Sequence, residues 1–358
     1  MSLDPKFAFI CCQPGAEIAL KSDLAREAPA WRFAFSRPGF LTFKWVDEAT
    51  IPDKVQFRSV LARTFGWSIG TVRHEDPAEL VSLAAEQLAA LQLSALHVWR
   101  RQSRAPTSAF PKIWTPESTE IGEQIRLQLV ERGVLANDVQ LNSQANRGAT
   151  VGDVVVMESN QLWVGWHTAL AFGQRWSGGV PSIELPERMI SRAYLKLKEG
   201  LMWSELPLDA GDRVIDLGSA PGGASQALLE CGAKVLGVDP AEMNPDVLNH
   251  PNFTHLRKRG SDVQRRVYRG YRWLVADANV APKHTLDTVE SIVAHNATDV
   301  EGMILTLKLS DWRMVDSISE YIRRVQSWGF ESVRCRHLAS NHQEICLAAL
   351  RRKNMRRR

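Results

Sequence analysis

The chain has 358 residues, 44% of them hydrophobic and 23% charged, a composition that allows two or three folded domains. No apolar run reaches the roughly 18 residues that a membrane-spanning helix needs, so we expect no membrane partner. The first ten residues lack the apolar stretch of a secretory signal, and we therefore expect a cytoplasmic protein.

The formal net charge of +4 is modest, but its distribution is uneven. Residues 351–358 carry six positive charges, so the rest of the chain has a net charge of −2. A second basic stretch runs from Arg257 to Arg272, with Asp262 as its one acidic residue. Both segments suit a phosphate backbone, although a solvated tail and a solvated helix face would have the same composition.

The cysteines and histidines show no metal-binding spacing. The five cysteines include no C-x-x-C pair, and the nine histidines include no H-x-x-x-H or H-E-x-x-H pair. An odd number of cysteines without such pairs is typical of a reduced protein rather than of a disulfide or zinc framework. From the spacing alone, we expect no metal.

The first predicted elements form two small α/β units. Asp76 is expected to cap, and Pro77 to begin, a helix that runs to Leu93. Residues 173–186, with three glycines and two prolines, predict a linker. The other elements, in order, are strands at 7–12, 31–35, 39–45 and 97–101, helices at 16–28 and 117–133, and a hairpin of strands at 153–157 and 161–168.

Beyond the linker, strands and helices alternate, which predicts a parallel sheet. The first of these strands ends in Asp216-Leu217-Gly218-Ser219, followed by Ala220-Pro221-Gly222-Gly223 and a helical pattern. Small residues at such a turn let backbone amides approach a bound ligand, because a Cβ would hold the ligand away. The predicted ligand-binding positions are Asp216, Gly218, Ala220, Pro221, Gly222 and Gly223.

A second strand, 234–238, ends in Asp239, twenty-one positions past Gly218. A carboxylate at this place can accept both hydroxyls of a ribose, as in other doubly wound sheets that bind nucleosides. The turn lacks the G-x-G-x-x-G pattern of dinucleotide sites, and the chain has no G-x-x-x-x-G-K-[ST] phosphate loop. The pattern resembles motif I of S-adenosyl-L-methionine (SAM)-dependent methyltransferases, in the Ala-Pro-Gly-Gly variant of FtsJ-like RNA ribose methyltransferases.

Four further segments resemble the FtsJ-like pattern, over most of residues 186–350. Ser191-Arg192-Ala193-Tyr194-Leu195-Lys196-Leu197 is similar to the family's S-R-A-x-x-K-L, and an apolar strand ends in Asp277. A buried-strand pattern is interrupted by Lys308, and Glu344 precedes a last apolar strand. The resemblance implies a catalytic tetrad of Lys196, Asp277, Lys308 and Glu344. It also implies SAM contacts at Ser191 and Asp277.

The tetrad suits a ribose 2′-hydroxyl, which must lose its proton as it attacks a methyl group. A lysine with the usual pKa of about 10.4 is charged at pH 7, but desolvation and a second ammonium group lower that pKa. Because Lys308 lies in an apolar strand, we expect it to be the more desolvated lysine and the general base. Lys196 is expected to supply positive potential, with Asp277 and Glu344 orienting the two ammonium groups.

Other methyl acceptors fit less well. Enzymes that methylate amino groups usually have [DNS]-P-P-[YF] after the fourth strand, where this chain has Asp277-Ala278-Asn279-Val280. Enzymes that methylate cytosine C5 need a cysteine near that loop, and none of the five lies there. For the acid that reads adenine, in a segment like L-R-x-D, Arg259 stands at the simplest match, and Asp262 is a candidate if the loop is longer.

The N-terminal half resembles the RlmM branch of this family, which methylates 23S rRNA, in Cys12-Gln13-Pro14-Gly15-Ala16-Glu17 and in Gly133-Val134-Leu135-Ala136-Asn137. The resemblance implies an α/β protein with a ferredoxin-like domain at 1–66 and a THUMP-like RNA-binding domain at 71–172. A Rossmann-like methyltransferase domain would follow at 175–358. It implies an RNA partner, with a cytidine of 23S rRNA as the target. A non-catalytic RNA-binding assembly factor and a small-molecule O-methyltransferase are the alternatives.

Overall fold

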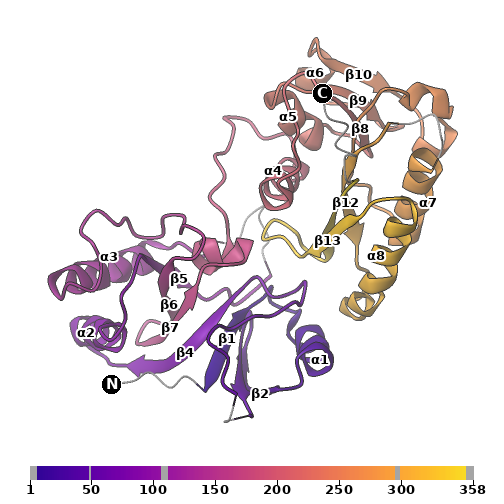
Figure 1. The fold of residues 1–358 in the computed structure, drawn as a ribbon. Helices are drawn as coiled ribbons and strands as arrows, with labels where there is room; N and C mark the ends of the chain where they lie inside the picture. Colours follow the sequence, from indigo (N-terminus) through magenta and orange to yellow (C-terminus); the bar gives the residue numbers. More distant parts are fainter. Residues whose placement is uncertain (1–5, 48–49, 106–111, 295–298, 352–358) are drawn as a thin grey trace, which may run out of the picture. The chain divides into compact units, whose positions relative to one another are not determined.

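The computed structural model describes residues 6–47, 50–105, 112–294 and 299–351. The chain forms two compact units, Met1–Ser182 and Ile183–Arg358, shown in Figure 1. Among the described residues, no helix combines the length and apolar content that crossing a membrane requires.

The first unit is built on a seven-stranded sheet with the order β2-β3-β1-β4-β7-β6-β5. All neighbouring strands are antiparallel except β5 and β6. The strands are β1 (Phe7–Cys11), β2 (Trp31–Arg37), β3 (Phe40–Trp45), β4 (Thr64–Arg73), β5 (Ala95–Arg100), β6 (Thr150–Glu158) and β7 (Gln161–Thr168), and the helices are α1 (Glu17–Glu27), α2 (Pro77–Leu88) and α3 (Pro116–Glu131).

Helix α2 begins where its capping residues predict, and α3 begins at a cap that the sequence analysis did not predict. The Asp76 side chain accepts a hydrogen bond from the Ala78 amide, with Pro77 at the first helical position. Thr115 and Ser118 form a capping box at the start of α3. Apolar residues of both helices pack with one face of β5, β6 and β7 in a single cluster that includes Leu88, Ile125 and Val154. This burial is the main force that holds the helices on the sheet.

The expected division near residues 66–71 falls inside β4, which the sequence did not predict. This strand pairs with β1 on one side and β7 on the other, so both N-terminal segments share one sheet. Gly66 and Gly70 interrupt the strand pattern in the sequence. A Cβ at Gly66 would collide with the Trp166 carbonyl oxygen, and the register shifts between Ser68 and Gly70. The ferredoxin-like and THUMP-like types stay predictions.

The expected linker belongs largely to the first unit. Its first part forms two short 3₁₀ turns, η1 (Phe172–Arg175) and η2 (Ser177–Gly179). The Gln174 side chain donates to the Phe65 carbonyl at 3.0 Å, and Arg63 Nε donates to the Gly178 carbonyl at 3.0 Å. These bonds hold the segment on the N-terminal sheet, and the boundary lies at Ser182 rather than near 175.

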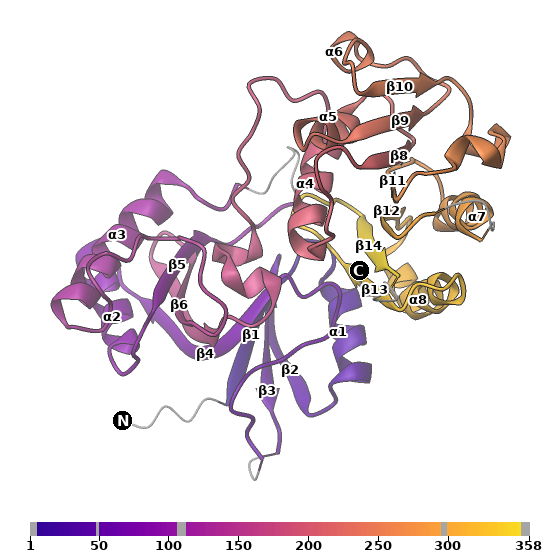
Figure 2. The same cartoon turned by 45° about the horizontal axis from the view of Figure 1, so that its top comes forward.

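The second unit is a doubly wound sheet with the order β10-β9-β8-β11-β12-β14-β13. Figure 2 shows α4 and α5 on one face and α7 and α8 on the other. The strands are β8 (Arg213–Leu217), β9 (Lys234–Val238), β10 (Phe253–Leu256), β11 (Trp273–Ala276), β12 (Gly302–Lys308), β13 (Ser332–Arg336) and β14 (Glu344–Leu350), and the helices are α4 (Ala193–Ser204), α5 (Gly223–Glu230), α6 (Pro245–Leu248), α7 (Pro282–Val293) and α8 (Ile318–Ser327). The predicted Rossmann-like fold is confirmed.

The strand order places a crevice between β8 and β11. The strands from β10 to β12 are parallel, and the order of the chain reverses between β8 and β11. Ligands of open α/β sheets bind at such a reversal, outside the carboxyl ends of the strands. The antiparallel strand β14 returns beside β12 and brings its first residue, Glu344, to the same edge.

The two basic segments differ in how they are folded. Residues 257–272 form two short 3₁₀ turns, η3 (Gly260–Asp262) and η4 (Arg265–Tyr268), and six of the seven basic residues are exposed. In the C-terminal tail, Arg351 donates to the carbonyl oxygens of Val293 and Trp328 and is part of the fold. Residues 352–358 lie outside the described part of the chain.

Candidate active site

The glycines of the turn after β8 have backbone conformations and close protein contacts that disfavour side chains. Gly218 has φ +75° and Gly222 has φ +124°, which disfavours a side chain at either position. A Cβ at Gly218 would lie 3.1 Å from the Ala278 backbone, and one at Gly223 would collide with Ser191 Oγ. Ser191 therefore packs over the start of α5, and the turn lies against the segment that follows β11. The turn from Gly218 to Gly223, which we call the cradle, is thus packed closely against neighbouring segments at the strand ends.

Asp239 lies at this edge, directly after β9, and is only partly buried. Its carboxylate accepts hydrogen bonds from the Ala220 amide at 3.3 Å and the Ala241 amide at 2.8 Å. Each carboxylate oxygen can accept a second bond, so both remain able to receive ribose hydroxyls. The cradle and this carboxylate fit an adenosine-containing cofactor such as SAM. Ala220 and the exposed Pro221 form the outer part of the same turn.

Asp216 has a different place from the one predicted. Its side chain is fully buried and accepts a hydrogen bond from Ser225 Oγ at 2.6 Å. Burial raises the pKa of Asp216 to about 7. Asp216 has no exposed surface, so it does not itself contact a ligand in this conformation. Through its hydrogen bond to Ser225 on α5, Asp216 positions the turn. Ser225 is the residue that sequence reasoning missed here.

Asp262 ends the turn η3 after β10, on the same side of the sheet as the cradle. It is exposed, and its Oδ1 accepts a hydrogen bond from Ser261 Oγ at 2.9 Å. The neighbouring Gly260 lies against Leu217 at the end of β8. This location leaves Asp262 as a candidate for contact with a base, which stays a prediction.

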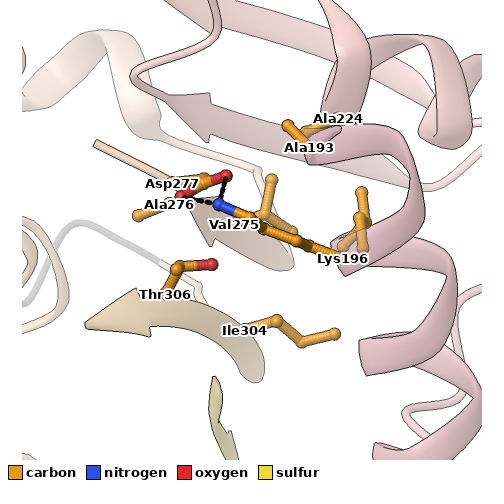
Figure 3. A pocket seen from close by; sticks show the side chains of 9 residues that line it. Ala193, Lys196, Ala224, Val275, Ala276, Asp277, Ile304 and Thr306 are labelled. Atoms are coloured by element: carbon orange, nitrogen blue, oxygen red, sulfur yellow. Dashed lines mark hydrogen bonds and ion pairs between the residues drawn. The ribbon is translucent and has the colours of Figure 1, made fainter. Parts of the chain in front are cut away.

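The four tetrad residues meet in one cluster. Lys196 Nζ lies 3.0 Å from Asp277 Oδ2 and 2.6 Å from Glu344 Oε1. Lys308 Nζ forms an ion pair with Glu344 Oε2 and lies 3.9 Å from Asp277 Oδ1. Figure 3 shows Lys196 reaching from its helix to Asp277 at the end of β11. The two carboxylates thus alternate with the two ammonium groups.

The backbone explains why these residues meet. Lys308 is the last residue of β12 and pairs directly with Glu344, the first residue of β14. Asp277 follows the neighbouring strand β11, and its amide donates to the Leu217 carbonyl at the end of β8. Lys196 comes from α4, which packs against β12 and β14. Strand ends and one helix therefore bring the charges together.

The exposures correct one expectation. The Lys196 side chain is 10% exposed and that of Lys308 is 27% exposed, so Lys196 is the more desolvated lysine. Lys308 is the last residue of β12, at the carboxyl edge of the sheet. Lys196 lies on α4, which packs against β12 and β14. Burial opposes the charge of Lys196, but Asp277 and Glu344 outweigh burial and raise its pKa. Lys196 is thus held as an ammonium ion by two carboxylates.

The two lysines of the cluster hold Glu344 in its charged form. Burial would raise its pKa, but Lys196 and Lys308 outweigh that effect and hold the pKa at about 2, below the usual 4.5. A carboxylate with a depressed pKa stabilises the folded state above its unfolded pKa, and this contribution is lost as the pH falls.

We expect Glu344→Gln to remove this acid-dependent stability. For the wild-type chain, the free energy of unfolding should fall between about pH 4.5 and pH 2 by on the order of 3 kcal/mol from this group, at about 1.4 kcal/mol per pKa unit. The variant should show a correspondingly shallower slope in urea titrations over this range. Glu320→Gln, at an exposed position of α8, is the control and should keep the wild-type slope.

A small pocket lies under the tetrad, between α4, β11 and β12 (Figure 3). Lys196 and Asp277 form its polar side, with Ala193, Ala224, Ile304 and Thr306 among the other lining residues. Its walls are mostly apolar, which keeps the Lys196 and Asp277 pair away from bulk water. Such a site strengthens electrostatic interactions among its charges.

Glu199 is a second residue that sequence reasoning missed. It is 1% exposed, and its carboxylate accepts bonds from the amides of Ala339 and Ser340 and from the Ser340 hydroxyl. These bonds fix the segment that leads into β14 and hence the position of Glu344. The spacing of three residues from Lys196 on one helix is the signal that would have found it.

Comparison with known proteins assigns the second unit to a family. Residues 189–340 match the model of FtsJ-like methyltransferases. This part of the chain is an FtsJ-like methyltransferase domain. The matched range of the FtsJ-like domain contains the cradle, Lys196, Asp277 and Lys308, and it ends four residues before Glu344.

Several curated proteins named Ribosomal RNA large subunit methyltransferase M are similar to this chain. The one from Thauera aminoaromatica is 29% identical over 180 residues, which are 48% of this chain and 48% of that protein. The one from Xylella fastidiosa is 28% identical over 49% of this chain and 51% of that protein, and the one from Methylococcus capsulatus 33% over 34% and 35%. The chain spans about half the length of the first relatives it matches. The expected resemblance to this branch is confirmed over about half of the chain.

Proposed function

We propose that this protein transfers a methyl group from SAM to a ribose 2′-hydroxyl of large-subunit ribosomal RNA. The observation that carries the proposal is the cluster of Lys196, Asp277, Lys308 and Glu344 at the edge of the sheet that also holds the cradle. The family match supports SAM as the cofactor, and the names of the relatives support ribosomal RNA as the substrate class. A cytidine target follows from the sequence resemblance.

The residues of the cradle would hold the cofactor. Asp239 would accept hydrogen bonds from the ribose hydroxyls, the backbone from Gly218 to Gly223 would bind the nucleoside, and Asp262 is the candidate for the adenine amino group. When bound, SAM supplies a methyl group that is electrophilic because it sits on a positively charged sulfur. Asp277, which follows β11 beside the reversal of the strand order, would face the reacting end of the cofactor.

Lys308 is the proposed general base. It is more exposed than Lys196 and contacts Glu344 directly, so an incoming hydroxyl can reach its amine. In its neutral form it takes the proton of the 2′-hydroxyl and becomes an ammonium ion, which the Glu344 carboxylate stabilises. Lys196, held as an ammonium ion by two carboxylates, orients them and supplies positive potential where the alkoxide develops.

RNA is the proposed partner and the cytoplasm the proposed location. The exposed basic residues between Arg257 and Arg272 follow β10, at the carboxyl edge where the cradle lies. Such residues bind phosphates without reading sequence. The N-terminal unit is proposed to present the RNA. A small-molecule O-methyltransferase needs neither the exposed basic residues nor a unit that presents RNA.

Methyl transfer from labelled SAM tests the proposal. The full chain is incubated with deproteinised 23S rRNA and, separately, with assembled large subunits. Nuclease digestion and mass spectrometry should then identify a 2′-O-methylated nucleoside. A base-methylated nucleoside would contradict the assignment of the acceptor. Absence of transfer to either RNA, with SAM still bound, would favour the non-catalytic assembly factor.

Asp239→Ala should lower SAM affinity at least about tenfold. The change removes the proposed partner of two ribose hydroxyls, and a lost hydrogen bond to a charged group costs about 1.5–3 kcal/mol. The measurement is isothermal titration calorimetry. Asp239→Asn keeps one acceptor oxygen and should lose less, whereas Asp287→Ala on α7 should bind as the wild type does. Unchanged affinity of Asp239→Ala would remove this residue from the cofactor site.

A further inference from the structure

Three buried residues of the N-terminal sheet form a cluster with metal-ligating side chains. His97, Asp153 and His167 lie on the adjacent strands β5, β6 and β7, and each offers one ligand atom within 4.8 Å of the others. His97 pairs directly with Asp153, and His167 pairs with Val151, two residues before Asp153. All three are at most 2% exposed.

The cluster points to the sheet face opposite the apolar core under α2 and α3. Side chains alternate along a strand, and the neighbours Leu96, Val98 and Val154 belong to that core. The opposite face is covered by the segment that contains η1 and η2, where Gly178 packs against Trp99. The three polar side chains are therefore enclosed and have no access to bulk water.

The backbone fixes the orientation of both histidine rings. His97 Nε2 lies 3.1 Å from the Ser143 carbonyl oxygen, and His167 Nε2 lies 2.7 Å from the Gln174 carbonyl oxygen. A carbonyl oxygen accepts only, so each Nε2 carries a proton and donates it. In the neutral tautomer each Nδ1 then bears a lone pair. Metal-bound histidines have this arrangement, in which the distal N–H is anchored on a backbone carbonyl.

The Nδ1 atoms and the Asp153 carboxylate face one another without enough donors. His167 Nδ1 contacts Asp153 Oδ2. Within the described part of the chain, no hydrogen-bond donor reaches His97 Nδ1 or Asp153 Oδ1, and both atoms are buried. Buried acceptors without a partner cost free energy, and a carboxylate without a cation costs more. A cation between the two Nδ1 atoms and the Asp153 carboxylate would give each of these atoms a partner.

We propose that His97, Asp153 and His167 bind a zinc ion that stabilises the N-terminal unit. Two imidazole nitrogens and one carboxylate oxygen are ligands that suit zinc, with a water molecule as the fourth. The ion would join three adjacent strands and, through Ser143 and Gln174, the two segments that cover them. Full burial makes this a structural site and not a catalytic one. The proposal does not depend on the proposed methyl transfer.

The test is the metal content of the full chain, purified without chelators or affinity metals. Mass spectrometry should find about one zinc ion per chain in the wild type. His97→Gln and Asp153→Asn should each retain less than about a tenth of that, because each removes a ligand. His74→Gln, an exposed histidine of the same unit, is the control and should bind as the wild type does.

A second measurement uses the wild-type chain alone, so it does not depend on how the variants fold. Protein produced in zinc-depleted medium should take up Co²⁺ with the intense visible absorption of a tetrahedral site, and Zn²⁺ should displace it. Its melting temperature should rise on addition of Zn²⁺. A wild-type chain with no bound metal, no such absorption and an unchanged melting temperature would overturn the proposal. The positive charge beside Asp153 would then be a proton on His167 Nδ1.

Discussion

Replacing Lys308 with methionine should lower the rate of methyl transfer by about 10²- to 10⁴-fold, the usual cost of losing a general base. Methionine keeps the length and apolar stem of the side chain but removes the proton acceptor. SAM affinity should change little, because the cradle lies on β8 and β9. Single-turnover transfer to RNA and calorimetry on the same preparation measure the two quantities.

Lys308→Arg separates proton transfer from electrostatics. Arginine keeps the positive charge beside Glu344 but cannot lose its proton near neutral pH. If Lys308 is the base, the arginine variant should be as slow as the methionine variant. Wild-type rates in the methionine variant would make the assignment wrong. Loss of SAM binding together with activity would make the lysine structural and Lys196 the next candidate for the base.

Lys196→Met should destabilise the folded chain by about 3–5 kcal/mol, the usual cost of removing one partner from a buried ion pair. The change leaves Asp277 without its nearest ammonium group and takes from Glu344 the partner at 2.6 Å. Urea unfolding monitored by circular dichroism gives the difference. Activity should also be lost, because the carboxylates are no longer oriented.

The control for this prediction is Lys198→Met on the same helix. The Lys198 side chain is 24% exposed and forms an ion pair with Glu230 at 3.2 Å, so its replacement should cost about 1 kcal/mol or less. Adding Asp277→Asn to Lys196→Met should restore part of the lost stability, since it removes a buried carboxylate that has lost its nearest ammonium group. A loss below about 1 kcal/mol for Lys196→Met would show that the cluster does not depend on this ammonium group.

The features that depend on local chain geometry could be predicted from the sequence alone. The turn from Gly218 to Gly223 and the carboxylate of Asp239 could be predicted because each follows directly from a strand end and the residues next to it. The order of Lys196, Asp277, Lys308 and Glu344 along the chain was visible as motifs. In a parallel sheet the carboxyl ends of neighbouring strands meet at one edge, so order along the chain was enough to expect a cluster.

The features that depend on packing between distant segments could be seen only in the folded protein. Local sequence predicted Lys308 to be the desolvated lysine, but α4 packs Lys196 against β12 and β14, whereas Lys308 lies at the open end of its strand. Spacing along the chain likewise gave no reason to join His97, Asp153 and His167, because register between three strands brings them together. Burial and cross-strand contact arise from the whole sheet, and no short stretch of sequence contains them.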